Sequence, residues 1–268
     1  MKKIFNLIDA GLGRLIFRND NNFIINLYGS FKRFLLNDVN KKNNFFHSGY
    51  IFSGKGNLNY CEELKLYINK FITKNFKKNT YNYTIPNNKK IIEISKKLFE
   101  SNKTLKSHLK DIFNNKFIIS DISIYRNFHF EAQNLSNEQY SNFYHCDHYL
   151  KTMFKVFIIL DDVNEKNGPL FFFDKRTTKK IIPKYYKNRT NYVSDLDRKF
   201  QASKFTGKIG DTLICSTTEC LHKAGIPEKN KMRDIIVYNL FNFKQTDPWH
   251  YENDLSHTLS KKFGKIKI

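Results

Sequence analysis

Apolar residues recur at three- and four-residue intervals in the N-terminal part of the chain, which is the spacing of one face of an α-helix. Three such stripes alternate with segments rich in Asn, Lys and Thr at 40–44 and 74–90, which are typical of loops. A further stripe runs from Ile4 to Leu15. The pattern predicts docked amphipathic helices. The three stripes are Leu64, Ile68, Phe71 and Ile72, then Ile91, Ile94 and Leu98, then Leu105, Leu109, Ile112 and Phe113.

The apolar period changes after Phe117, where short alternating or continuous apolar runs replace the helical stripes. Turn residues such as Asn167-Gly168-Pro169 separate these runs. Short strands joined by Gly and Pro turns favour an antiparallel jelly roll over a doubly wound α/β sheet. We therefore predict a mainly β fold with N-terminal helices, a cupin-like double-stranded β-helix. The runs cover 122–125, 153–160, 170–173, 212–215 and 235–241.

The length of 268 residues suits one domain, in which we distinguish three regions. Residues 1–116 are predicted to form a helical region packed on the core, and residues 117–245 the double-stranded β-helix. Residues 246–268 would form a C-terminal tail. The segment 174–204 is basic and rich in Tyr with weak periodicity, so it is predicted to be an excursion from the mouth of the barrel.

The formal net charge of +21 favours contact with nucleic acid or a membrane surface. The charge is spread along the chain, however, and abundant Lys, Asn, Ile and Phe are typical of AT-rich coding, so a nucleic-acid partner is disfavoured. The four cysteines form no C-x-x-C pair, which fits a reducing cytoplasm. No apolar run is long enough to span a bilayer, although the first helix offers a peripheral membrane contact as the lesser alternative.

The candidate chemistry centres on the motif His145-Cys146-Asp147. Alternate side chains of an extended segment share a face, so His145 and Asp147 point the same way while Cys146 points away. An imidazole and a carboxylate at this spacing can bind one metal ion, and an ordinary surface pair is the simpler alternative. By the same alternation, His148 is predicted to lie outside the ligand set.

Two later residues extend this motif. His222 follows the run at 212–215, and Arg233 precedes the run at 235–241. Two imidazoles and one carboxylate leave positions open on a metal, as in non-haem Fe(II) sites that activate dioxygen. The planar fork of an Arg can then pair with the distal carboxylate of an organic co-ligand. Arg126 lies on a strand that should flank the pocket, where it would reach the co-ligand or form a structural salt bridge.

The order of these motifs resembles the phytanoyl-CoA dioxygenase family of Fe(II)/2-oxoglutarate-dependent oxygenases, over roughly residues 118–243. The resemblance implies that the two His and the Asp bind Fe(II), and that 2-oxoglutarate chelates the iron and pairs with Arg233. The chain departs from the family at 173–177, which lacks the usual Pro-Gly-Ser-His turn, and at Ala224, where many members have Ser. The motifs are His145-x-Asp147, Asn167-Gly168-Pro169-Leu170, Gly210-Asp211, His222 and Arg233.

The implied activity is that of a cytoplasmic dioxygenase that uses O2 and 2-oxoglutarate and releases succinate and CO2. Its simplest reaction is hydroxylation of an aliphatic C–H bond on a small-molecule or carrier-linked metabolite, and desaturation or ring closure stays open. Halogenation is disfavoured because Asp147 leaves no position for a halide. The basic residues from Lys175 to Lys180 suggest an anionic group on the substrate. The rival functions are a catalytically silent cupin-like binding protein and a nucleic-acid-directed oxygenase.

Overall fold

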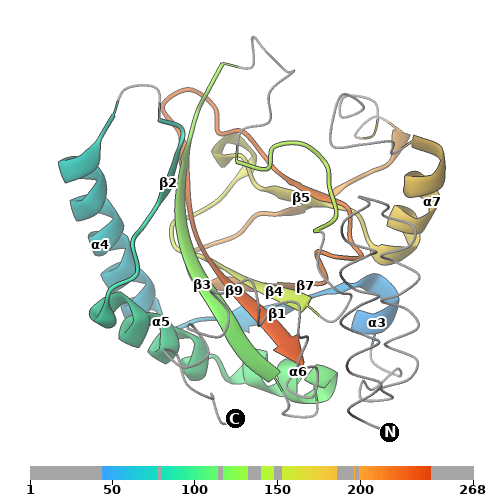
Figure 1. Cartoon of the computed structure of the whole chain (residues 1–268), viewed down its shortest axis with the longest axis horizontal. Coiled ribbons are helices and arrows are strands. Elements are labelled where there is room, and N and C mark those ends of the chain that lie inside the picture. The colour runs from blue at the N-terminus through green and yellow to red at the C-terminus, as the bar shows by residue number, and fades with distance from the viewer. Residues whose placement is uncertain are drawn as a thin grey trace, which may run out of the picture.

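Two antiparallel sheets form the body of the protein in the computed structural model (Figure 1). The larger sheet has the strand order β1-β7-β4-β9-β3-β2 and the smaller one the order β6-β5-β8. This architecture confirms the predicted double-stranded β-helix. The first predicted helix and the C-terminal tail lie outside the described residues. The structure describes residues 44–77, 80–113, 117–131, 140–147, 153–185, 196 and 199–242.

The strands follow the apolar runs of the sequence, and β3 and β9 are the longest of them. Their pairing extends from Phe117↔Asn242 to Phe128↔Met232, with one irregularity between Ile119 and Asp121. The large sheet contains β1 (Tyr50–Lys55), β2 (Asn82–Thr84), β3 (Phe117–Phe128), β4 (Met153–Ile159), β7 (Asp211–Cys215) and β9 (Met232–Asn242). The small sheet contains β5 (Leu170–Phe172), β6 (Ser203–Phe205) and β8 (His222–Ala224).

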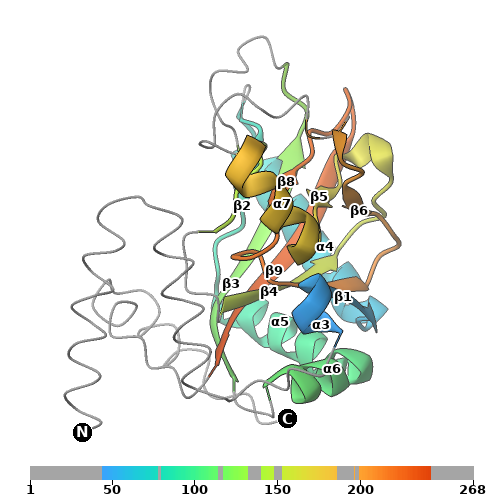
Figure 2. The same cartoon turned by 90° about the vertical axis from the view of Figure 1, so that its right-hand side faces the viewer.

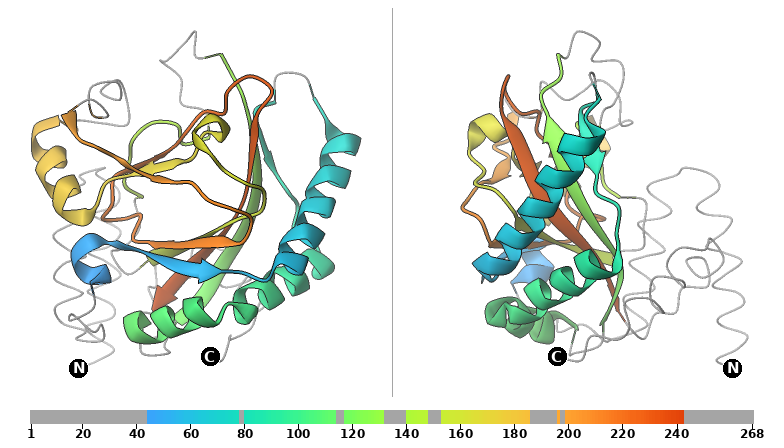
Figure 3. Two further views of the ribbon diagram at one scale, coloured as in Figure 1. Left: turned by 180° about the vertical axis from the view of Figure 1, so that it is seen from behind. Right: turned by 90° about the vertical axis from the view of Figure 1, so that its left-hand side faces the viewer.

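Three helices match the predicted stripes and cover the outer face of the large sheet (Figure 3). The side chain of Asn57 accepts a hydrogen bond from a backbone N–H at the start of α4, and that of Asn88 does so for α5, as N-caps do. In Figure 1, α4 and α5 lie along the outer side of β3 and β9. The helices are α3 (Phe45–Ser48), α4 (Leu58–Asn75), α5 (Lys89–Ser101), α6 (Lys103–Phe113), the 3₁₀ turn η1 (Glu165–Asn167) and α7 (Lys175–Tyr185).

Strand alternation divides the buried residues between two cores. On β9, Ile236 and Tyr238 face the helices, and the Tyr238 hydroxyl donates to the Ser95 carbonyl of α5 at 2.7 Å. Ile235 and Val237 face the smaller sheet instead. The inner faces of the two sheets therefore enclose a second, smaller apolar core, and the candidate site opens within it.

The N-terminal region contributes two strands that the sequence analysis does not predict. β1 pairs with β7 and β2 pairs with β3, so these short strands form the two edges of the large sheet. Neither carries an apolar period long enough to signal a strand, and β2 reads only Asn82-Tyr83-Thr84. Pairing with the long central strands, rather than local propensity, makes them β.

The basic segment after Asp174 begins as a helix, whereas weak periodicity predicted an irregular excursion. Asp174 caps this helix, α7, by accepting from the backbone N–H of Thr177 at 2.6 Å. Its residue Ile181 is buried against Tyr144 and Leu221. Figure 2 shows α7 next to the strands of the small sheet. None of the helices in the described part of the chain combines the length and apolar character needed to cross a membrane.

Candidate metal and co-substrate site

Backbone pairing brings the two predicted His ligands together. The N–H of His145 donates to the carbonyl of His222, and the N–H of His222 donates back to the carbonyl of His145, both at 2.9 Å. The N–H of Asp147 donates to the Thr217 carbonyl at 3.0 Å, which anchors the carboxylate beside them. One ligand atom from each of His145, Asp147 and His222 lies within 4.8 Å of the others. The structure thus gathers the predicted triad into one cluster.

Both imidazoles are oriented by backbone carbonyls. Nδ1 of His145 lies 2.8 Å from the Phe143 carbonyl, and Nδ1 of His222 lies 2.9 Å from the Cys220 carbonyl. Because a carbonyl only accepts, each Nδ1 carries the proton and each Nε2 is left as the metal-ligating atom. Both side chains are buried. This is the tautomer and the support that a metal-binding His needs.

Helix α7 contacts the chain next to His222 on the side away from the cavity. The backbone N–H of Leu221 donates to the buried hydroxyl of Thr178 at 2.9 Å, immediately before His222. The rings of Tyr144 and Phe173 also pack together, with centroids 5.1 Å apart. Helix α7, which follows β5 in the chain, therefore helps to hold β8, the strand that carries His222.

Asp147 is shared between an imidazole and a lysine. Its Oδ1 lies 3.7 Å from Nε2 of His145, and its Oδ2 lies 2.7 Å from Nζ of Lys155 on β4. Although burial raises the pKa of Asp147, the positive charge of Lys155 outweighs the effect of burial, and the pKa falls well below its usual range. The carboxylate is therefore ionised at neutral pH, as a metal ligand must be.

The triad lines a cavity of about 340 Å³ between the two sheets. The cavity walls combine polar and apolar side chains, most of them from β3, β4, β5 and β9. Ala224, which stands where the resemblance expects Ser, also lies in this wall. The polar lining includes Ser123, Asn127, Tyr140, Lys155, Arg233 and Asn239, and the apolar lining includes Phe157, Leu170, Ile235 and Val237.

Arg233 reaches the same cavity from the start of β9 and is buried. One terminal nitrogen donates to Asn127 Oδ1 at 2.6 Å, and the other donates to the Gly168 carbonyl. Its Nε has no hydrogen-bond partner, and no carboxylate among the described residues forms an ion pair with it. Burial lowers the pKa of Arg233 to about 10, so the group stays charged at neutral pH. A buried cation with neutral partners is suited to an anionic ligand.

The carbonyl that accepts from Arg233 depends on a glycine. Gly168 has a positive φ of 65°, and a Cβ there would lie 2.5 Å from backbone atoms of Ile226 and Pro227. Only glycine fits this turn without moving the backbone. The Asn167-Gly168-Pro169 motif therefore serves to bring the β5 turn against the start of β9.

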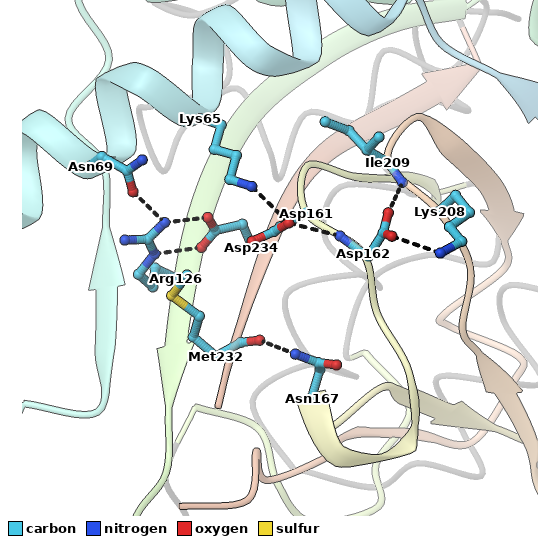
Figure 4. A network of polar contacts seen from close by, with 10 residues as sticks. All are labelled: Lys65, Asn69, Arg126, Asp161, Asp162, Asn167, Lys208, Ile209, Met232 and Asp234. Carbon is cyan, nitrogen blue, oxygen red and sulfur yellow. Dashed lines mark hydrogen bonds and ion pairs between the residues drawn. The ribbon is translucent and has the colours of Figure 1, made fainter. Parts of the chain in front are cut away.

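Arg126 does not line the cavity, which corrects its predicted role as a co-substrate ligand. It pairs with Asp234 and Asn69 instead (Figure 4). Its Nε and Nη2 donate to the two carboxylate oxygens of Asp234 at 2.6 and 2.5 Å, and Nη2 also donates to Asn69 of α4 at 2.8 Å. Tyr125 and Asn127 line the cavity, so alternation turns the residue between them outward. The structural salt bridge, which was the alternative, is what the structure contains.

Removal of one partner of this ion pair is expected to lower stability strongly. Arg126 and Asp234 are both almost completely buried, so Asp234→Ala would leave an unpaired charge and lower the free energy of unfolding by about 3–5 kcal/mol. The control is Lys208→Ala, which removes the exposed pair with Asp162 and should cost at most about 1 kcal/mol. Urea unfolding of the two variants measures both, and equal losses would contradict the assignment.

The remaining predicted residues lie outside the cavity. Gly210 and Asp211 shape the turn before β7, where Asp211 accepts from the backbone N–H of Lys208 at 2.8 Å. Lys175 forms an ion pair with Glu219 at 2.9 Å, and the predicted basic residues from Lys175 to Lys180 do not line the cavity. His148 lies outside the described residues. Lys155 and Asn127 are site residues that the sequence did not predict, and the signal for Lys155 is a lone cation in the apolar run 153–160.

Comparison with solved structures shows the fold of the chain. SnoN, a non-haem α-ketoglutarate-dependent epimerase from nogalamycin biosynthesis, matches with a TM-score of 0.53 at 8% identity, over 74% of this chain and 80% of its own. HygX from Streptomyces hygroscopicus, with nickel and 2-oxoglutarate bound, matches with a TM-score of 0.52 at 12% identity, over 76% and 86%. AviO1 from Streptomyces viridochromogenes matches with a TM-score of 0.52 at 15% identity, over 74% and 92%.

Comparison of the sequence with protein families and with curated proteins finds no match. The resemblance to the phytanoyl-CoA dioxygenase family therefore stays a prediction, whereas the double-stranded β-helix shared with these solved structures is established.

Proposed function

We propose that this protein is a non-haem Fe(II)- and 2-oxoglutarate-dependent dioxygenase. One observation carries the proposal: a His-Asp-His cluster with two buried imidazoles and a buried Arg233 without a carboxylate partner among the described residues line the same cavity. The triad supplies the donor set that Fe(II) takes in oxygenases. When bound, the iron would activate O2 at the expense of 2-oxoglutarate, which leaves as succinate and CO2.

Each residue has a distinct part in this proposal. His145, Asp147 and His222 would bind the iron, and the carbonyl contacts at Nδ1 would keep the imidazoles in the ligating tautomer. Arg233 would hold the 5-carboxylate of 2-oxoglutarate, with Asn127 fixing its guanidinium. HygX, a fold neighbour, binds nickel and 2-oxoglutarate, which supports this choice of co-substrate.

The reaction that we propose is hydroxylation of an aliphatic C–H bond on a small-molecule or carrier-linked substrate. The cavity of about 340 Å³ is at the lower end of the size typical of small-molecule sites, and its walls mix apolar and polar groups as such sites do. The fold neighbour SnoN is an epimerase, so product analysis must distinguish a gain of hydroxyl from an inversion at carbon.

The decisive experiment is an anaerobic titration of the metal-free protein with Fe(II) and then 2-oxoglutarate. We expect one iron and one 2-oxoglutarate per chain, with the weak visible charge-transfer band of the chelate. Oxygen should then give succinate. Folded protein that binds neither, or binds both without forming succinate, would contradict the proposal and favour the silent binding protein.

A further inference from the structure

Lys155 is a cation placed in the apolar run of β4, with Phe154 and Val156 on either side of it. Those neighbours face the helices, so alternation turns Lys155 into the cavity, on the same side as Phe157. Its side chain is 19% exposed. Burying most of a long cationic side chain costs free energy, which requires a compensating partner. That partner is Asp147.

In the contact with Lys155, the two oxygens of the Asp147 carboxylate have different partners. Oδ1 is the oxygen near Nε2 of His145, at 3.7 Å, whereas Oδ2 lies 2.7 Å from the ammonium of Lys155. No aligned hydrogen-bond donor reaches Oδ2 from the described residues, so the ammonium holds it as an ion pair. One oxygen thus lies near the His145 imidazole, and the other contacts the ammonium of Lys155.

We propose that Lys155 is a positioning residue that keeps Asp147 a one-oxygen metal ligand and so preserves a coordination position for the co-substrate. This inference rests on the proposed function. A carboxylate can bind a metal through one oxygen or through both. With one oxygen and two imidazoles, an octahedral ion keeps three positions, enough for chelating 2-oxoglutarate and for O2. If both oxygens bound, only two positions would remain.

The proposal predicts opposite effects on metal and co-substrate in Lys155→Met. The variant should bind Co(II) at least as tightly as wild type, because a positive charge has gone and a second oxygen is available. Its dissociation constant for 2-oxoglutarate should rise roughly tenfold to a hundredfold, because one chelating oxygen of the co-substrate must then compete with Oδ2 for a coordination position. Lys155→Arg should restore most of the affinity, since its guanidinium also pairs with a carboxylate.

A second readout separates the coordination position from simple loss of charge. The relaxation of water protons by the Mn(II)-loaded protein reports the water bound to the metal. In Lys155→Met this relaxation should fall by about a third, since one of three open positions would be taken by Oδ2. Lys155→Leu is a second neutral variant for the same measurements if the Met variant does not fold by circular dichroism.

Lys65→Met is the matched control. It removes an ammonium that lies 2.7 Å from the carboxylate of Asp161, but on α4 and outside the cavity, so metal affinity, water relaxation and 2-oxoglutarate affinity should not change. Unchanged 2-oxoglutarate affinity and unchanged water relaxation in Lys155→Met would overturn the inference. Loss of the metal from this variant would also overturn it, because Lys155 would then have a merely structural role. Failure of the wild type to bind metal or 2-oxoglutarate would instead overturn the proposed function.

Discussion

Substitution of any residue of the triad by alanine is expected to abolish turnover. His145→Ala and His222→Ala each remove one of two imidazoles whose ligand atoms lie within 4.8 Å of the Asp147 carboxylate. Because the metal would then keep only two protein ligands, its affinity should fall by at least about a hundredfold. Asp147→Ala should do the same, and it would also leave Lys155 without its carboxylate partner. Equilibrium dialysis against Fe(II) or Co(II), together with succinate release, measures both losses.

The matched control for these variants is His148→Ala. His148 is adjacent to the motif, and alternation in an extended segment is expected to turn it away from His145 and Asp147. This variant should retain one metal per chain and substantial activity. Loss of metal in His148→Ala to the same extent as in His145→Ala would overturn the ligand assignment. Circular dichroism of each variant separates a lost ligand from a lost fold.

Replacement of Arg233 should weaken 2-oxoglutarate binding strongly while the metal is retained. In Arg233→Met the cavity loses the buried cation that would face the 5-carboxylate, and its contacts with Asn127 and Gly168 disappear. Removing one partner of a buried charged pair costs about 2–5 kcal/mol, which raises the dissociation constant roughly 30-fold to several thousandfold. Calorimetric titration of the Co(II)-loaded variant with 2-oxoglutarate measures this change.

Arg126→Met provides the comparison for Arg233. Both guanidinium groups are buried, and Arg126 is on β3 opposite the neighbour of Arg233, but Arg126 faces α4 rather than the cavity. The Arg126 variant should lose stability and keep its affinity for 2-oxoglutarate. If Arg233→Met bound 2-oxoglutarate as tightly as wild type, the proposed co-substrate contact would be wrong. Weakened binding in Arg126→Met at a temperature where it remains folded would reinstate the role predicted from its position in the sequence.

The two arginines show how far sequence reasoning reaches. Arg126 directly follows one apolar run and Arg233 precedes another, so both are candidates for the pocket. Which face of β3 turns inward depends on its register with β9, where Asn127 pairs with Arg233 and Arg126 pairs with Asp234. A shift by one residue would exchange the two faces. The sequence contains the alternation of side chains, but the pairing of β3 with β9 decides which alternate residues of β3 face the cavity.

Local patterns were sufficient for helices α4, α5 and α6, for most strands and for the order of the candidate ligands. Helical stripes and Asn caps act within a few residues, and strand runs carry their own turn signals, so these features can be read without a partner. The short strands β1, β2, β6 and β8, helices α3 and α7 and the Lys155–Asp147 contact could not be read in this way.

The sequence by itself therefore determined the fold class and placed His145-x-Asp147 before His222 and Arg233. Only the tertiary structure brought His145 and His222 into reciprocal backbone pairing, buried Arg233 within the same cavity, and set Lys155 against Asp147. The physical reason is that these contacts join segments far apart in the chain. Their geometry depends on strand register and on burial between the two sheets, neither of which is encoded within any single segment.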